Sequence, residues 1–542
     1  MNFLEKLNKN LLTSLFFSIL VFAILAWIQS KGKNVGLIEP DSWRYVHIGD
    51  SNENIKNALF LAKGGKLNEY ATSNHMPGVY LYLSLFFSLL PNDIFSNSTG
   101  NEVLLVSFSN FITIFTAISL VFFAINLVAN NKFYNWLSKL LFLGILLDLY
   151  IRFDFYRILS ETYLPWIQLT YLVLIYHYLK DKESRFSYLI AGFYFITISI
   201  FFGLTNVFTD FVFLAFSSFF IISNIKQLKT LSFVPGLLIL LLLYFKSADL
   251  DFHYWIIVTN RAQGLGSGLQ FLTHIANSAI HWPSNWYTPG GFGPIYDNQF
   301  YTIILGGIVL FLFRKERSIF FLTMISILVL PFDSWRYSEE GFIQASQSYK
   351  TDVNMGVCFF FILILVQQLP KNIETYFDSM KRRFHFDTNI PYTNLAISFI
   401  MLICAFRILS FLMDYAEIEN KYRLDHSEWI KNQNLCKQNF IKTNPNCSCL
   451  VIMHWDQQFF IRNNVIPCNK QFSSYSPHLN FNDEYFHRIQ SSFTENKAKF
   501  LLSHSDLYTN KTVLSPRLVD LFKSGQCDSV VDNLLFICKK GN

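Results

Sequence analysis

The chain has 542 residues, of which 52% are hydrophobic, 18% aromatic and 15% charged, and its formal net charge is +6. Soluble globular domains contain about 25% charged residues. The composition therefore excludes a soluble globular protein and predicts a chain that lies mostly within a lipid bilayer.

Apolar runs follow one another along the chain, and about eleven of them have the length, or nearly the length, to cross a membrane. A helix needs about 20 apolar residues to cross the hydrocarbon core. In chain order the runs are Leu11–Gln29, Val103–Ala129, Trp136–Ile151, Tyr163–Leu179, Phe186–Leu204, Val207–Ser223, Phe233–Phe245, Tyr301–Phe313, Ile319–Pro331, Val353–Leu369 and Leu395–Met413. We therefore predict an α-helical polytopic membrane protein. The first run has no small-residue cleavage site before Lys31, so it is interpreted as a retained helix and not as a signal peptide.

The distribution of Lys and Arg predicts the orientation of the helices. Short cytoplasmic connections of membrane proteins are enriched in these residues. If the amino terminus is cytoplasmic, every cytoplasmic connection is basic, through Lys6, Lys9, Lys132, Lys139, Lys180, Lys182, Arg185, Lys226, Lys229, Arg314, Lys315, Arg317, Lys371, Lys381, Arg382 and Arg383. An odd number of crossings then puts the segment after Met413 outside. We expect a bacterial inner (plasma) membrane, with that segment periplasmic or extracellular.

This orientation divides the chain into two predicted domains. Residues 1–413 form the transmembrane domain, with long external loops at 30–102 and 246–300, and residues 414–542 form an external domain. In the external domain Leu450–His454, Lys499–His504 and Asn533–Lys539 have strand patterns, and Pro516–Lys523 has a helix pattern. The predicted fold class is thus a helical membrane protein with a small carboxy-terminal α/β domain.

Six of the eight cysteines belong to the external domain: Cys436, Cys447, Cys449, Cys468, Cys527 and Cys538. The other two, Cys358 and Cys404, lie in predicted helices. An even set in one soluble region indicates disulfides formed in an oxidising compartment. The pairing does not follow from the sequence, and a metal site is the competing interpretation.

The first external loop contains two short helical patterns and a repeated string. Ile55–Lys63 has helical spacing, and Gly78–Leu90 is apolar but too short to span comfortably, so we expect it to lie at the membrane interface or to re-enter. The string Asp-Ser-Trp-Arg-Tyr occurs at Asp41–Tyr45 and again at Asp333–Tyr337. Chance is the favoured explanation, because the sequences around the two copies do not match.

Two motifs in this loop carry a resemblance to a known family. Glu39-Pro-Asp41-Ser-Trp-Arg44-Tyr45-Val-His-Ile follows the first helix, and His75-Met-Pro-Gly-Val-Tyr-Leu-Tyr-Leu comes later. The chain here resembles the GT-C glycosyltransferases, in the branch with the lipid A aminoarabinose transferases and protein O-mannosyltransferases. Those enzymes place an acidic motif after helix one and a Pro-rich motif before an aromatic helix. A third point of similarity is Arg157-Ile-Leu-Ser-Glu161, where the family has another acidic residue.

The resemblance implies an integral membrane hexosyl- or pentosyltransferase that moves a sugar from a polyprenyl-phosphate donor to a lipid, glycan or protein acceptor. Asp41 would be the base in an inverting single displacement, and Glu161 would orient Arg44 or hold a divalent ion with Asp41. The departing phosphate gains negative charge, and cationic side chains stabilise that charge. The candidate substrate-binding residues are Arg44, Tyr45, His75, Arg157, Arg336, Lys350 and Arg407. No other cofactor and no nucleic-acid partner is expected.

Each assignment has a structural alternative. Asp41 could cap a helix that begins near Trp43, and Arg44 could anchor the chain among lipid headgroups. Glu161 lies at a predicted helix start, where an acidic residue suits the dipole. His75 could be an ordinary loop residue, and Arg407 could extend to the membrane interface.

Two other functional classes remain open. The first is an O-antigen polymerase or ligase, although these enzymes seldom end in an external α/β domain. The second is a transporter or flippase. Transporters usually contain internal repeats and helices broken near the midplane, and neither feature is visible in the sequence.

Overall fold

The computed structural model describes residues 3–30, 49–64, 78–90, 99–129, 131–152, 158, 160–180, 186–203, 206–224, 273, 276–277, 299–333, 355–368, 450–452, 500–502, 527–531 and 535–538. Every structural statement below refers to this part of the chain.

The described residues are mainly helical. The helices are α1 (Phe3–Ser30), α2 (Gly49–Ala62), α4 (Gly78–Phe87), α5 (Thr99–Val128), α6 (Lys132–Arg152), α7 (Ser160–Lys180), α8 (Phe186–Phe202), α9 (Val207–Ser223), α13 (Gln299–Leu312), α14 (Arg317–Asp333) and the helix Met355–Gln368. All but two of the apolar runs predicted to span the membrane are therefore confirmed as helices. The two exceptions, Phe233–Phe245 and Leu395–Met413, lie outside the described residues.

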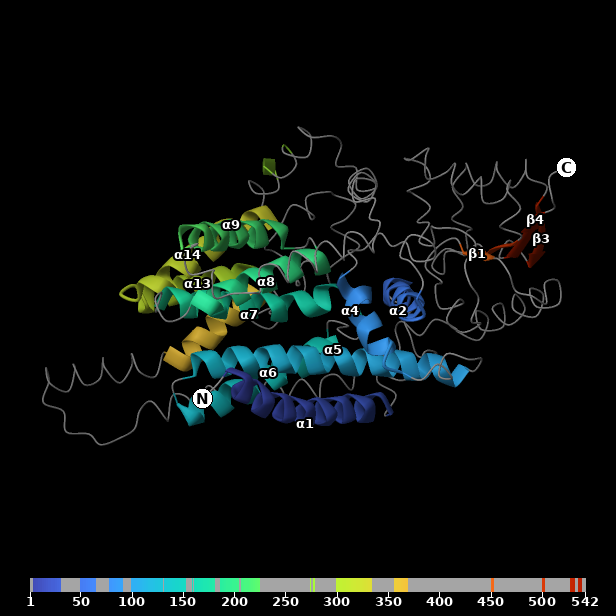
Figure 1. The fold of residues 1–542 in the computed structure, drawn as a ribbon, viewed down its shortest axis with the longest axis horizontal. Helices are drawn as coiled ribbons and strands as arrows, with labels where there is room; N and C mark the ends of the chain where they lie inside the picture. Colours follow the sequence, from blue (N-terminus) through green and yellow to red (C-terminus); the bar gives the residue numbers. More distant parts are fainter. Residues whose placement is uncertain are drawn as a thin grey trace, which may run out of the picture.

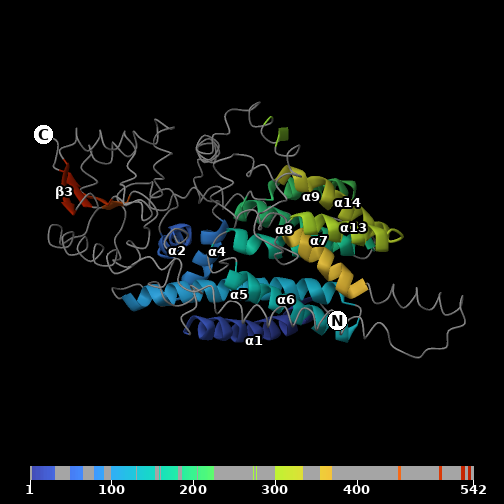
Figure 2. The ribbon, with the colours of Figure 1, turned by 180° about the vertical axis from the view of Figure 1, so that it is seen from behind.

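The long helices run roughly side by side in one elongated bundle. Figure 1 shows α1, α5 and α6 along one side and α8, α9, α13 and α14 along the other, with α7 between them. The view from behind in Figure 2 shows the same order. Helix α5 packs against α1 and α7, α7 packs against α8 and α14, and α9 packs against α8 and α14.

The bundle has two distinct ends, and we name one of them the α2 end. There Asn54 of α2 contacts Ile158, which precedes α7, and Asp333 at the last residue of α14 contacts the start of α9. At the opposite end, the amide of Asn126 in α5 donates a hydrogen bond to the Asn10 side chain of α1. Consecutive long helices thus run in alternating directions.

Positive charge collects at the opposite end in the described residues. Lys132 begins α6, Lys180 ends α7, and Arg314 and Lys315 lie in the turn between α13 and α14, where Arg317 begins α14. Helix α9 ends at the end opposite to α2, and α13 begins at the α2 end. We therefore expect one further crossing of the bundle between these two helices. The predicted run Phe233–Phe245 is the segment expected to make that crossing.

The outer faces of the peripheral helices are apolar. Leu12 and Phe16 of α1 are 72% and 63% exposed, and Phe311 of α13 and Leu328 of α14 are similarly open. Polar groups such as Asp210 lie inside. Soluble proteins rarely expose apolar surface on this scale, and charged groups in membrane helices face the bundle interior. Asn10–Ile28 and Leu104–Val128 are each long and apolar enough to cross a bilayer by themselves. We conclude that the chain is a membrane protein.

Helix α7 is the centre of the core. Every residue from Thr162 to Tyr176 is buried, so this helix has no solvent-facing or lipid-facing side over four turns. The Trp166 ring stacks on Phe359 of the helix Met355–Gln368, with the ring centroids 4.9 Å apart. The same helix is tied to α6 at its far end, because the Gln367 amide donates to the carbonyl of Tyr134 and to the hydroxyl of Ser138.

A small sheet is described near the carboxy terminus, beyond the α2 end in Figure 1. Its strands are β1 (Leu450–Ile452), β2 (Phe500–Leu502), β3 (Cys527–Val531) and β4 (Leu535–Cys538), in the order β1-β2-β4-β3. Strands β1 and β2 are parallel, and β4 is antiparallel to both of its neighbours. The three predicted strands are confirmed. Strand β3 was not predicted from the sequence, and the predicted helix Pro516–Lys523 lies outside the described residues.

Gly356 marks the closest approach of two helices and offers a test of this packing. A Cβ atom at Gly356 would lie 2.5 Å from the Pro165 carbonyl oxygen and 2.5 Å from the Gln168 Cβ of α7, whereas one at Gly307 in α13 would meet nothing within 4 Å. We expect Gly356→Ala to lower stability by about 1–3 kcal/mol, as overpacking does. Gly307→Ala should leave stability unchanged or raise it by up to about 1 kcal/mol, through helix propensity.

The measurement is the thermal unfolding midpoint of each variant in detergent, compared with the parent chain. Equal midpoints for the two variants would contradict the close packing of α7 against the helix Met355–Gln368.

Candidate functional site

Helices α2 and α4 cover the bundle at the α2 end. Apolar residues at helical spacing in α2, namely Ile55, Ala58 and Leu59, are buried against α4 and form one face of the helix. In α4, Gly78 lies so close to the end of α8 that a Cβ atom there would be 2.6 Å from the Phe201 carbonyl oxygen. Two elements of the predicted first external loop are therefore held against the bundle itself.

One hydrogen bond joins α2 to the segment that leads into α7. The side-chain amide of Asn54 donates to the backbone carbonyl of Ile158, at 2.8 Å, and both residues are buried. The two residues are 104 positions apart in the sequence. The bond therefore fixes α2 relative to the segment that precedes α7.

Below α4 the core contains two hydroxyl pairs and a pair of aromatic rings. Tyr82 of α4 and Thr116 of α5 are 2.6 Å apart, and Thr113 of α5 and Tyr163 of α7 are 2.7 Å apart. The rings of Tyr82 and Tyr163 meet edge to face, with centroids 5.8 Å apart. These contacts join α4, α5 and α7 directly beneath the α2 end.

Asp333 joins the end of α14 to the start of α9. Its carboxylate accepts hydrogen bonds from the backbone N–H of Phe208 at 2.8 Å and from the backbone N–H and hydroxyl of Thr209, the latter at 2.5 Å. The first N–H groups of a helix have no partner within the helix, and a negative charge is favourable there. Asn206, at the N-cap position of α9, makes no side-chain capping bond. Asp333 therefore caps α9 from a different helix.

A second buried carboxylate lies one turn further into α9. The Tyr171 hydroxyl of α7 donates to Asp210 Oδ1 at 2.9 Å, and Asp210 Oδ2 has no hydrogen-bond partner among the described residues. Both Asp210 and Asp333 are fully buried. Two buried carboxylates, Asp210 of α9 and Asp333 of α14, thus lie at the start of α9, and Asp210 is bonded to the most buried of the described helices.

Most of the residues predicted to form the site lie outside the described residues. They are Asp41, Arg44, Tyr45, His75, Arg157, Arg336, Lys350 and Arg407. The backbone of Glu161 lies in the first turn of α7. Within the described part of the chain no group of three or more His, Cys, Asp or Glu side chains could hold a metal ion, so the predicted divalent ion at Asp41 and Glu161 stays a prediction.

Most of the described neighbours of these residues nevertheless meet at one end of the bundle. Asp41 precedes the start of α2, His75 precedes α4, Arg157 directly precedes Ile158, Arg336 follows Asp333, and Lys350 precedes Met355. The first four neighbouring elements begin or end at the α2 end, whereas the helix that begins at Met355 starts beside Pro165 and Gln168 of α7. Arg407 has no described neighbour.

The sequence alone did not identify Asn54 or Asp333. Asn54 gives no signal of its own, because its partner is a backbone carbonyl far along the chain. Asp333 does give a signal in the sequence, because it lies at the last residue of α14, where the helix dipole disfavours a carboxylate. An acidic residue in that unfavourable position indicates an external partner, which here is the amino terminus of α9.

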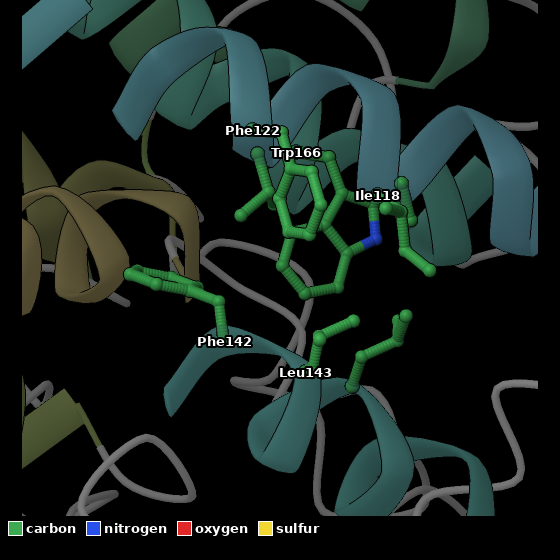
Figure 3. Close-up of a pocket in the computed structure, with 8 residues that line it drawn as sticks. Ile118, Phe122, Phe142, Leu143 and Trp166 are labelled. Atoms are coloured by element: carbon green, nitrogen blue, oxygen red, sulfur yellow. The ribbon is translucent and has the colours of Figure 1, made fainter. Parts of the chain in front are cut away.

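A pocket among the described helices is unsuited to a sugar. Ala117, Ile118, Val121 and Phe122 of α5, Phe142, Leu143 and Leu146 of α6, and Trp166 of α7 line it. Figure 3 shows these side chains around the Trp166 indole, whose nitrogen has no hydrogen-bond partner in the described part of the chain. The cavity volume is about 10 Å³, roughly the space that one water molecule needs. We therefore assign it to core packing and not to substrate binding.

Comparisons with known proteins give only distant similarities. No family model matches the chain, and no curated protein matches it. The matching solved structures include the Archaeoglobus fulgidus oligosaccharyltransferase in its apo form, with 12% identity, a TM-score of 0.44, and coverage of 93% of this chain and 72% of that one. They also include the archaeal oligosaccharyltransferase AglB from Archaeoglobus fulgidus in complex with an inhibitory peptide and a dolichol-phosphate, with 11% identity, a TM-score of 0.44, and coverage of 94% and 70%. Neither similarity is close enough to establish a shared fold.

The hydrogen bond from Asn54 can be tested against a matched residue of the same helix. Asn57 is also fully buried, but neither polar atom of its side chain has a hydrogen-bond partner within the described ranges. Both Asn→Ala changes remove the same atoms. Only Asn54→Ala removes a hydrogen bond to the buried Ile158 carbonyl, and a typical buried hydrogen bond contributes about 0.5–1.5 kcal/mol. We expect Asn54→Ala to have the lower thermal midpoint in detergent, and the same midpoint for both variants would show that the bond does not hold α2 in place.

The cap on α9 can be tested with two Thr→Val variants. The Thr209 hydroxyl donates to Asp333, whereas the hydroxyl of Thr323 in α14 is buried and has no hydrogen-bond partner in the part of the chain that the structure describes. Thr209→Val should therefore lose about 1–2 kcal/mol, since the acceptor is charged. Thr323→Val should be neutral or stabilising.

Denaturation in a detergent and denaturant mixture measures both free energies. The free-energy cost of Asp333→Asn is measured twice, once in the parent chain and once in the Thr209→Val variant. Equal costs would mean that the two residues are energetically independent, and this would refute the capping interaction between them.

Proposed function

We propose that the protein is a GT-C type membrane glycosyltransferase that moves a sugar from a polyprenyl-phosphate donor to a lipid, glycan or protein acceptor. The proposal rests first on the sequence motifs at Asp41, at His75 and at Arg157-Ile-Leu-Ser-Glu161. These are three separate segments, so a single site requires that the fold bring them together.

The hydrogen bond between Asn54 and Ile158 is the observation that carries the proposal. Asn54 belongs to α2, the first described helix after the Asp41 motif, and Ile158 lies between Arg157 and Glu161. The elements that flank the two predicted carboxylates are therefore in contact. Helix α4, which follows the His75 motif, packs against α2 at the same end.

The proposed reaction is a single displacement. The Asp41 carboxylate takes the proton of the acceptor hydroxyl as its oxygen attacks the anomeric carbon. The bond from that carbon to the phosphate oxygen breaks on the opposite face, so the configuration of the sugar inverts. The departing phosphate gains negative charge, which Arg44, Arg336 and Lys350 would stabilise. Glu161 would orient Arg44, and Tyr45, His75 and Arg157 would contact the substrates.

The same proposal places the reaction on the non-cytoplasmic face. The basic residues Lys132, Lys180, Arg314, Lys315 and Arg317 lie at the end of the bundle opposite to α2. If these residues are cytoplasmic, as the positive-inside rule favours, the α2 end and the carboxy-terminal sheet face the other side of the membrane.

Asp41→Asn tests the assignment of the base. The amide cannot accept the proton, so we expect transfer to fall by about 10²–10⁴-fold. Asp93→Asn, in the same predicted external loop but outside the motifs, is the matched control and should retain activity. The assay uses the purified full chain in lipid nanodiscs, a panel of radiolabelled polyprenyl-phosphate sugars, and extracted envelope lipids and glycans as acceptors.

The measured quantity is the release of polyprenyl phosphate together with the appearance of label in the acceptor. Activity of Asp41→Asn equal to that of the parent chain would remove Asp41 from the mechanism. An inactive parent chain across the whole panel, in a fold-competent preparation, would oppose the function itself.

A further inference from the structure

Two cysteines occupy directly opposite positions in the carboxy-terminal sheet. Strands β3 and β4 pair in antiparallel fashion, and the register makes Cys527 the Cα partner of Cys538. The next partners along the pair are Asp528 with Ile537 and Ser529 with Phe536. The cysteines therefore stand at the open end of a short hairpin, away from its turn.

This register meets the backbone requirement of a disulfide. Residues directly opposite each other in an antiparallel pair have Cα atoms about 4.5–5.5 Å apart and lie on the same face of the sheet. Disulfides join residues whose Cα atoms are about 4.4–6.8 Å apart. A one-residue slip of the register would move one cysteine to the other face. The irregularity between Ser529 and Val531 lies between the cysteine pair and the turn, so the strands stay in register from Cys527 to Ser529.

We propose that Cys527 and Cys538 form a disulfide that closes the β3–β4 hairpin. The bond forms by thiol–disulfide exchange with a disulfide-donating oxidoreductase. The two thiols lose two protons and two electrons, one S–S bond forms between them, and the donor disulfide is reduced to two thiols. This proposal is independent of the glycosyltransferase function.

The disulfide has a consequence for the placement of the sheet. Disulfides persist in the periplasm, at the cell surface and in the secretory lumen, and they are rare in the cytosol. A sheet closed by Cys527–Cys538 therefore lies on the non-cytoplasmic side. This conclusion does not use the distribution of Lys and Arg, so it is a separate route to the orientation. Cys358, in contrast, is not part of a disulfide and is buried in the helix Met355–Gln368.

Both cysteines lie on one tryptic peptide, which makes the test direct. Cleavage after Lys523 and Lys539 releases residues 524–539, and no other Lys or Arg lies between them. The full chain is purified from membranes, unfolded with N-ethylmaleimide present to block free thiols, and digested. We expect this peptide to be unmodified and lighter by two hydrogens than its reduced form. Cys358, blocked in the same sample, is the internal control for complete labelling.

A second digestion identifies the partner. Cleavage before Asp528 and Asp532 separates Cys527 from Cys538, so the proposed bond leaves two peptides joined until reduction. Blocked thiols at both positions before reduction, or a bond from either cysteine to another residue, would overturn the proposal. In the Cys527→Ser variant, Cys538 should become fully reactive to N-ethylmaleimide, and Cys538→Ser should have the same effect on Cys527. A thiol that stays protected in either variant would also count against the pair.

Discussion

The complete burial of α7 is the constraint on which the rest of the bundle depends. A helix without an exposed side must be covered all round, and α5, α8, α14 and the helix Met355–Gln368 contribute to this cover. The fit is close enough that glycine is needed at Gly356. In lipid the apolar surface of α7 gains little from burial, so tight packing and interhelical hydrogen bonds hold the neighbours in place. The start of α7 is thereby fixed relative to every element that meets it.

That fixed start explains why the α2 end is the best candidate for a site. A catalytic group acts only when its geometry is maintained by rigid surroundings, and loops obtain this rigidity from the elements that flank them. The hydrogen bond from Asn54 and the contact of Gly78 with α8 attach α2 and α4 to the bundle. Asp333 attaches the end of α14 to α9. The flanks of the predicted motifs are thus anchored at a common end, although they are distant in sequence.

Local sequence patterns predicted the helices well and the contacts between them poorly. Phe186–Leu204 was predicted and α8 is Phe186–Phe202, because a long apolar run is sufficient to indicate a helix. The strand β3 was missed, since Cys527-Asp-Ser-Val-Val has only two β-branched residues at its end. The partners of Asn54 and Asp333 depend on which helices become neighbours. A single sequence has many buried polar residues of the same types, so it does not specify those pairs.

The two copies of Asp-Ser-Trp-Arg-Tyr show how little an identical string says about chemistry. In the second copy Asp333 uses both carboxylate oxygens to accept bonds from the start of α9. A carboxylate whose two oxygens accept bonds from structural donors in this way serves as a helix cap. A catalytic Asp41 must instead keep an oxygen available to the acceptor hydroxyl. The string that contains Asp41 is therefore not sufficient to assign its role, which depends on the groups that the fold brings to its carboxylate.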